Sequence, residues 1–240
     1  MLRGVVVAAL SAVSVVAVSA QTVREVDIPM ADGVVLKGSY FAPQSGGAAV
    51  LLLPQCDKDR RAWRAVATDL AAAGMHVLTI DFRGLGESGG KPSSDEERRT
   101  LSAKWPKDVD AALAFLIGRQ GVDSGRIAVG GASCGVPQAS AAAQRQRSAR
   151  ALLLLSGPAM DDARAYIAKT PGLAVFGAAA AQDIAAVQGS KDLVGASTNP
   201  ASTLKVYDGT AHGVELLAAN KDLQTSLVTW LAQQLSGTKR

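Results

Sequence analysis

The amino-acid sequence predicts an α/β protein built on a mostly parallel, doubly wound sheet with helices on both faces. Short, almost continuously apolar runs alternate with longer helical patterns along the 240 residues. Strands buried on both faces have this composition, and their alternation with helices implies right-handed crossover connections. The overall composition agrees, because 48% apolar and 19% charged residues argue against a disordered or coiled-coil chain.

The N-terminal segment is typical of a cleavable secretory signal. Residues 4–20 carry no charge, Arg3 precedes them, and small residues form a cleavage site before Gln21. An uncleaved anchor is the alternative, although the segment is at the short limit of the roughly 17–25 residues that span a bilayer. We expect residues 1–20 to be a signal peptide and residues 21–240 one domain, secreted or periplasmic, with no stable membrane insertion after cleavage.

The predicted strands come next along the chain. Residues 23–29 and 33–41 alternate in polarity around a turn at Asp32-Gly33, which predicts an antiparallel hairpin at the start of the sheet. The buried parallel strands that follow are predicted at 49–54, 76–81, 126–131, 151–157 and 173–177, with a shorter one beginning at 203.

Helical patterns separate these strands, and no low-complexity linker interrupts them. The helices are predicted at 59–74, 105–120, 134–147, 183–195 and 214–235. In open α/β sheets the chemistry lies at the carboxyl ends of the strands, so the residues just after each apolar run are the candidates for a functional site. The 25 basic and 21 acidic side chains are mixed along the chain, which argues against a nucleic-acid partner.

A nucleophile motif follows the strand at 126–131. Gly131-Ala132-Ser133-Cys134-Gly135 is a G-x-S-x-G sequence between a strand and an alanine-rich helix. In this context the strained turn exposes the serine hydroxyl, and the helix start directs amide groups at developing negative charge. The alternative is a glycine-rich turn with an incidental serine. We take Ser133 as the candidate nucleophile.

A serine nucleophile needs a base, and the chain has two histidines. His76 begins a buried strand, far from its carboxyl end, and is expected to be structural. His212 lies in a loop before the last helix and is the only histidine after Ser133. The chain order serine, acid, histidine therefore selects His212, with a solvated loop histidine as the alternative.

The acid of such a triad should lie between Ser133 and His212. Asp183 follows the apolar run at 173–177 and leaves about 20 residues for a helix before the next strand. Asp192 is the alternative, but it would require a strand at 184–188 and leave too little chain for a helix. We favour Asp183, which would hold the imidazole in the required tautomer.

These motifs together resemble the α/β-hydrolase family, particularly its dienelactone-hydrolase-like and small serine-esterase-like members. The segments that carry the resemblance are LLLPQCDKDRRAW, LAAAGMHVLTIDFRGLGESGG, GGASCG and DGTAHG. The resemblance implies an exported serine hydrolase that cleaves small or medium esters, lactones or thioesters through an acyl-enzyme. It implies a small-molecule substrate and neither a metal nor an organic cofactor; nothing in the sequence indicates an oligomeric state.

The resemblance also implies where the oxyanion hole lies. Many members carry His-Gly after the third strand, where this chain has Pro54-Gln55 followed by Cys56. One amide would come from Cys134 and the other from Gln55 or Cys56, because proline has no N–H; we favour Cys56. Two such amides lie within disulfide range, so we predict a Cys56–Cys134 bridge, with two buried free thiols as the alternative.

Other features bear on the substrate and on competing functions. Only about 15 residues separate the strands at 151–157 and 173–177, which predicts a minimal cap or none. Dienelactone hydrolases proper use a cysteine nucleophile, which argues against that activity here. A binding protein without turnover and an exopeptidase of the same fold are the competing functions. Candidate walls of the substrate site are Trp63, Trp105, Met160, Tyr166 and Ile167.

Overall fold

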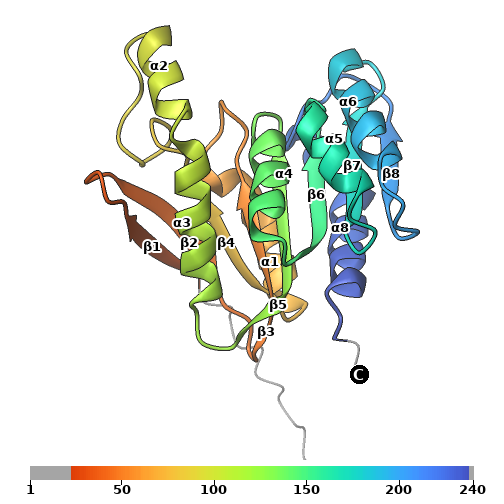
Figure 1. Cartoon of the computed structure of the whole chain (residues 1–240), viewed down its shortest axis with the longest axis horizontal. Helices are drawn as coiled ribbons and strands as arrows, with labels where there is room; N and C mark the ends of the chain where they lie inside the picture. Colours follow the sequence, from red (N-terminus) through yellow and green to blue (C-terminus); the bar gives the residue numbers. More distant parts are fainter. Residues whose placement is uncertain (1–22, 238–240) are drawn as a thin grey trace, which may run out of the picture.

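The computed structural model describes residues 23–237, and every strand in this range belongs to one sheet (Figure 1). The strands are β1 (Val23–Pro29), β2 (Val35–Phe41), β3 (Gly47–Leu53), β4 (His76–Ile80), β5 (Val122–Ala132), β6 (Ala149–Leu155), β7 (Ala174–Ala180) and β8 (Thr203–Tyr207). Their order is β1-β2-β4-β3-β5-β6-β7-β8. β1 and β2 pair antiparallel, as do β2 and β4, and all other neighbours are parallel. The predicted fold class is confirmed; the predicted signal, residues 1–20, lies outside the described residues.

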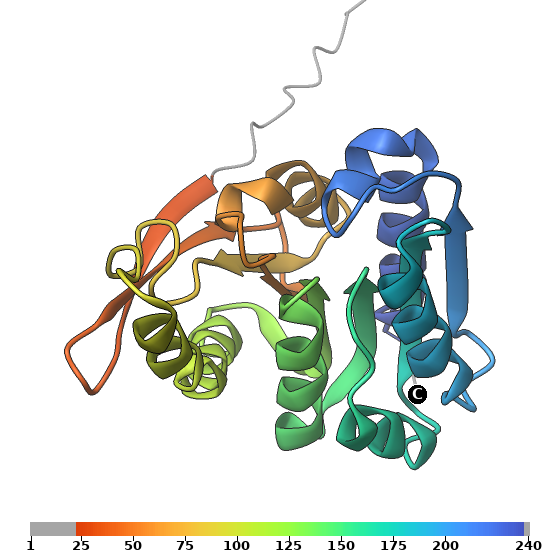
Figure 2. The same cartoon turned by 90° about the horizontal axis from the view of Figure 1, so that it is seen from above.

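Helices cover both faces of the sheet, as Figure 2 shows from above. One face carries α1 (Arg64–Ala72) and α8 (Lys221–Gln234), and the other carries α3 (Trp105–Ile117), α4 (Gly135–Gln146), α5 (Asp161–Ala168) and α6 (Ile184–Gly195). Along β3, Leu51 and Leu53 belong to the core beneath α3 and α4, whereas Val50 and Leu52 belong to the core beneath α1 and α8. This two-sided burial explains why the parallel strands are continuously apolar in the sequence.

The connections differ from the sequence prediction in four places. The helix predicted at 214–235 is broken at Asn220, whose backbone is extended, into α7 (Glu215–Ala219) and α8. The helix predicted at 59–74 begins with a short 3-10 turn, η1 (Arg60–Trp63). Two short helices were not predicted: α5, and α2 (Asp95–Ser102), which buries none of its residues and therefore has no apolar stripe to reveal it.

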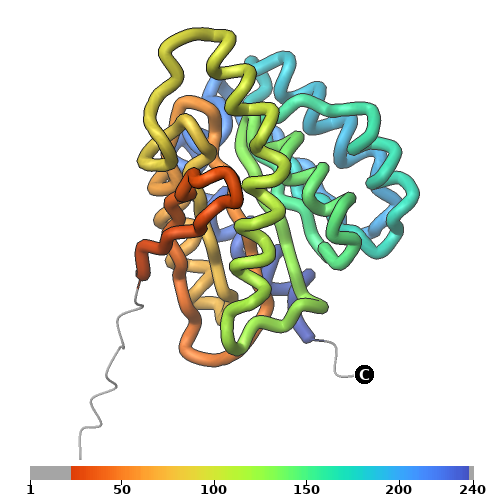
Figure 3. The backbone as a smooth tube through the Cα atoms, turned by 60° about the vertical axis from the view of Figure 1, so that its left-hand side comes forward, coloured from red at the N-terminus to blue at the C-terminus, as the bar shows by residue number. Residues whose placement is uncertain are grey.

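The longest excursion at the carboxyl ends of the strands connects β4 to α3. Residues 81–104 include α2 and rise above the rest of the fold in Figure 3. Between β6 and β7, by contrast, the chain forms only α5 and its flanking turns. The prediction of a minimal cap therefore holds for the β6–β7 connection. The longer β4–α3 connection forms one edge of the predicted site at the carboxyl ends of the strands.

Two buried ion pairs anchor this excursion. Asp81 is fully buried and accepts hydrogen bonds from the Arg60 backbone (2.6 Å) and guanidinium (2.5 Å). Arg83 is also buried and binds both carboxylate oxygens of Asp108 at 2.7 and 2.5 Å. Burial raises the pKa of Asp108, and the Arg83 guanidinium opposes that rise. Removing one partner of such a pair typically costs about 3–5 kcal/mol, which makes this segment architectural.

Candidate active site

Ser133 lies on a sharp turn between β5 and α4. Its φ of 51° is in the left-handed region, and its amide donates to the carbonyl of Leu155 at 2.8 Å. A Cβ at Gly131 would collide with the carbonyl of Gly135, and one at Gly135 would lie 2.7 Å from the carbonyl oxygen of Pro54. The two glycines are thus required by close backbone approach, and together they place Ser133 at the carboxyl end of β5.

The three predicted side chains meet in one hydrogen-bonded line. Ser133 Oγ lies 2.8 Å from His212 Nε2, and His212 Nδ1 lies 2.5 Å from Asp183 Oδ2. A carboxylate only accepts hydrogen bonds, so Nδ1 carries the proton and Nε2 is free to accept from the serine hydroxyl. The His212 side chain is 41% exposed and the Asp183 side chain 19% exposed, so solvent reaches this line of side chains at its serine and histidine end. This is the arrangement that activates a serine for attack on a carbonyl.

Asp183, not Asp192, is the carboxylate of this line. Asp183 follows β7 and occupies the N-cap of α6, but its side chain makes no capping hydrogen bond, which leaves the carboxylate to His212. Asp192 lies on α6 itself, where it accepts a hydrogen bond from Gln188. The alternative built on Asp192 needed a strand at 184–188, and the chain is helical there.

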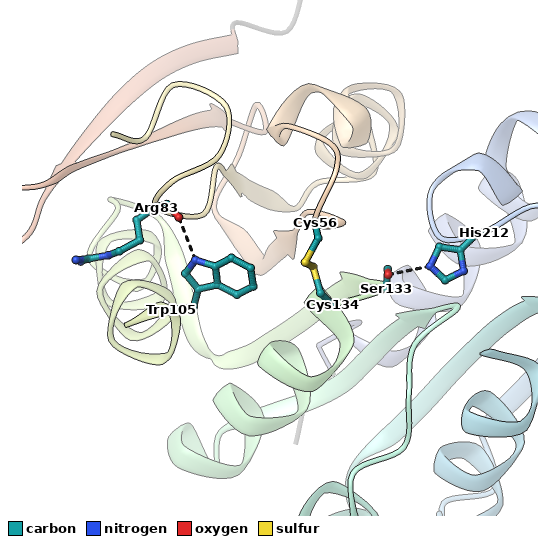
Figure 4. The surroundings of a disulfide bond; sticks show 6 residues. All are labelled: Cys56, Arg83, Trp105, Ser133, Cys134 and His212. Carbon is teal, nitrogen blue, oxygen red and sulfur yellow. Dashed lines mark hydrogen bonds between the residues drawn. A yellow bond between two sulfur atoms is a disulfide. The ribbon is translucent and has the colours of Figure 1, made fainter. Parts of the chain in front are cut away.

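The two cysteines form a disulfide beside Ser133. Cys56 and Cys134 are joined with their Cα atoms 5.8 Å apart, and the bond closes a loop with a sequence separation of 78 (Figure 4). Neither amide of the two cysteines donates to an acceptor within residues 23–237. Cys134 is also the N-cap of α4, so its amide lies at the positive end of that helix. The predicted pairing is present, and it brings the two predicted oxyanion donors together.

A cavity of about 590 Å³ lies beside this disulfide, with Cys56 and Trp105 in its lining. In Figure 4, Trp105 and Ser133 lie on opposite sides of the disulfide. The cavity is bounded by the loop after β3 and by the β4–α3 excursion; its lining comprises Cys56, Asp57, Lys58, Asp59, Leu85, Gly86, Lys91, Pro92, Arg98 and Trp105. The Trp105 indole stacks on Phe82 and donates to the carbonyl of Arg83 at 3.1 Å, so its orientation is fixed. The volume is in the range that accommodates small ligands.

Of the candidate walls, Trp105 lines this cavity. Trp63 and Ile167 are fully buried core residues, which corrects their assignment as walls. Tyr166 donates to the carbonyl of Ala143 at 3.0 Å, and Met160 is 48% exposed. The predicted structural role of His76 agrees with its burial and with the 2.6 Å hydrogen bond between its Nδ1 and Tyr40 Oη.

Two residues near the site, Gln55 and Ser156, have side chains whose contacts the sequence did not indicate. The amide side chain of Gln55 is buried and reaches the segment after His212, whereas the sequence had offered only its backbone N–H. Ser156 follows β6, the strand between those that carry Ser133 and Asp183, and has a φ of 51°. Its buried hydroxyl has no hydrogen-bond partner among the described residues. No local sequence signal marks either residue.

Neither a metal cluster nor a membrane span is found in the part of the chain that the structure describes. No group of three or more His, Cys, Asp or Glu side chains in residues 23–237 could hold a metal ion. In the same range, no helix has both the length and the apolar character needed to cross a bilayer.

Comparison with known proteins adds a family assignment to this geometry. The family model described as serine aminopeptidase, S33, matches residues 47–179. An uncharacterized protein of Mycobacterium tuberculosis (strain CDC 1551 / Oshkosh) is 38% identical over 135 residues, which cover 55% of this chain and 45% of that protein. The thiohydrolase apmlB of Arthrinium phaeospermum is 32% identical over 121 residues, covering 50% and 38%. The chain thus spans less than half the length of these two relatives.

Similar solved structures support the fold. A dienelactone hydrolase from Anabaena variabilis superposes with a TM-score of 0.69 at 20% sequence identity, covering 90% of this chain and 99% of that chain. At that level of identity, the likeness concerns the arrangement of strands and helices.

Proposed function

Because the chain belongs to the α/β-hydrolase family described as serine aminopeptidase, S33, we propose that it is a serine hydrolase acting on small or medium carboxylic esters, lactones or thioesters. The observation that carries the proposal is the hydrogen-bonded line from Ser133 through His212 to Asp183. Each of these side chains comes from a different strand end of the sheet, where α/β folds bind their ligands.

In the proposed reaction, Ser133 Oγ attacks the substrate carbonyl while its proton passes to His212 Nε2. The tetrahedral oxyanion collapses, the bond to the alcohol or thiol breaks, and His212 returns the proton to that leaving group. Water then attacks the acyl-enzyme with its proton going to His212, and the carboxylic acid is released as Ser133 recovers its hydroxyl proton. Asp183 holds the imidazole and stabilises its cationic form throughout, without being protonated.

The amides of Cys56 and Cys134 are the proposed oxyanion donors. They have no acceptor within the described residues, and the disulfide keeps their backbones close. Removing one donor of this kind costs about 2.7–4 kcal/mol of transition-state stabilisation in a serine hydrolase.

The cavity bounded by Trp105 and Leu85 supports a substrate of small or medium size. We propose that it receives the larger apolar portion of the substrate, because it borders the Cys56 side of the proposed oxyanion hole. Among these substrates, the thioesters gain support from similarity to a thiohydrolase.

The test is labelling with a fluorophosphonate probe, which reacts only with an activated serine. We expect stoichiometric labelling of the folded protein that Ser133→Ala abolishes, followed by turnover of p-nitrophenyl, thioester and lactone substrates. A folded protein that the probe does not label would instead support a binding protein without turnover.

A second candidate is an aminopeptidase, which the description of the matching family favours. It uses the same serine and histidine, so the probe does not separate the two activities. Hydrolysis of aminoacyl anilides faster than that of the matched N-blocked esters would select it.

We also propose that residues 1–20 direct export and are removed before Gln21. Their uncharged run supports this, and so does the Cys56–Cys134 disulfide, since such bonds persist in oxidising compartments. N-terminal sequencing of protein recovered from the periplasm of a Gram-negative host should begin at Gln21. Recovery with residues 1–20 still attached would contradict cleavage.

A further inference from the structure

The side chain of Gln55 connects the loop after β3 to the segment that carries His212. It is buried, with 5% of its surface exposed, although it lies in a loop. Its Oε1 accepts a hydrogen bond from the Val214 amide at 3.1 Å, and its Nε2 donates to Glu215 Oε2 at 3.3 Å. Both partners lie within three residues of His212, and they are 159 and 160 positions away from Gln55 in the sequence.

The turn between His212 and Val214 is packed directly against this amide. Gly213 has a φ of 59°, and a Cβ at that position would collide with the Gln55 Oε1 and lie 2.8 Å from its Cδ. A residue with a side chain would therefore displace either Gln55 or the turn. The path of the backbone after His212 is thus fitted to the Gln55 side chain.

Charge fixes the orientation of the Gln55 amide. Lys58 lies 2.8 Å from Glu215 Oε1. Partial burial raises the pKa of Glu215, but its bonds to Lys58 and Gln55 outweigh burial and lower the pKa overall. Glu215 is therefore an ionised acceptor, so the Gln55 nitrogen faces it and the Gln55 oxygen faces the Val214 amide.

The residue after Gln55 is Cys56, whose side chain is bonded to Cys134. Two adjacent residues of one loop thus reach two different parts of the site. Cys56 is tied to the turn that carries Ser133, and Gln55 is tied to the turn that carries His212.

We propose that Gln55 is a positioning residue, which sets the backbone after His212 so that the imidazole keeps its place between Ser133 and Asp183. This inference rests on the proposed hydrolase function. Without the Gln55 amide, the buried Val214 N–H loses its acceptor, and the turn is free to shift to recover one. A shift of about 1 Å in a reacting group can reduce the rate about 100-fold.

The test compares Gln55→Leu, Gln55→Glu, Glu215→Gln and the double variant Gln55→Glu/Glu215→Gln. Gln55→Leu removes both hydrogen bonds at similar volume, so we expect kcat to fall about 10- to 100-fold with KM within about twofold. Gln55→Glu keeps an acceptor for Val214 but opposes two carboxylates, so it should also be impaired. The double variant exchanges amide and carboxylate and restores the pairing, so it should recover most of kcat.

The control is Gln224→Leu, which removes a glutamine that bonds to Asp69 on the opposite face of the sheet from α4 and should leave kcat unchanged. Melting temperature is measured for every variant, and kcat is measured well below it. A Gln55→Leu protein that is folded and keeps wild-type kcat would overturn the proposal, as would failure of the double variant to exceed Gln55→Glu. If the wild-type protein itself is not labelled by the fluorophosphonate probe, the hydrolase function fails first. If wild type and Gln55→Leu are labelled at equal rates, only the role of Gln55 fails.

Discussion

We expect removal of the Cys56–Cys134 disulfide to lower both the free energy of unfolding and kcat, and the two effects can be measured independently. The bond closes a loop with a sequence separation of 78. In the chain-entropy model a loop of this length contributes about 4.5 kcal/mol to the free energy of unfolding. For a domain of this size, that corresponds to a decrease of about 9–18 °C in melting temperature. Loss of one fixed oxyanion donor should additionally reduce kcat about 10²- to 10³-fold.

The two effects are measured on the double variant Cys56→Ser/Cys134→Ser and on wild type with and without a phosphine reductant. Calorimetry gives the melting temperature, and kcat for a p-nitrophenyl ester is measured at 15 °C, where both proteins should be folded. The double variant should be insensitive to the reductant, which separates loss of the bond from any direct effect of the reagent. If a folded protein without the disulfide keeps the kcat of wild type, the disulfide does not hold the oxyanion donors in place. That conclusion would stand whatever the change in melting temperature.

Three further predictions test other parts of the structure. Asp183→Asn should reduce kcat about 10⁴-fold, whereas Asp192→Asn on the surface of α6 should stay within twofold; equal effects would contradict the assignment of the acid. Hydrogen bonds from Arg61 and then Arg60 lower the pKa of Glu87 from 4.5 to about 2, so these ion pairs stabilise the fold above pH 4.5 and are lost as the pH falls towards 2. The urea midpoint should therefore fall less between pH 6 and pH 3 in Glu87→Gln than in wild type, and an equal fall would show that the pairs do not contribute. Leu85→Trp should fill the cavity and reduce kcat/KM for a phenylbutyrate ester at least about tenfold relative to an acetate ester; parallel losses for both esters would place the acyl group elsewhere.

The elements that the sequence predicted best are those whose signal is local. The strands of the parallel sheet were recognisable because burial on both faces makes each of them continuously apolar. The candidate nucleophile was recognisable because its turn needs glycine on both sides of Ser133, where the backbones approach closely. With only two histidines in the chain, chain order then sufficed to select His212.

The elements that were missed depend on contacts between distant segments or lack an apolar pattern. α2 is held by a Ser94 cap and an acidic first turn, and no buried face marks it in the sequence. The acid was not missed: the sequence favoured Asp183 over Asp192 from the chain length left for a helix, and the extent of β7 and α6, which places Asp183 at a helix start, agrees with that choice. Gln55 has a role only because the fold brings it to Val214, so no pattern around position 55 could reveal that role.

The departure from His-Gly after the third strand acquires a physical meaning from these contacts. Taken alone, Pro54 removes an amide N–H and would weaken an oxyanion hole. The next two residues, however, connect the loop to other parts of the site through their side chains. Gln55 is hydrogen-bonded to the turn after His212, and Cys56 is bonded to the turn that carries Ser133. Loops at the carboxyl end of a sheet have no ladder of hydrogen bonds to hold them. The positions of groups at such a site must therefore be fixed by side chains that join one loop to another. Here two consecutive residues, Gln55 and Cys56, make these connections.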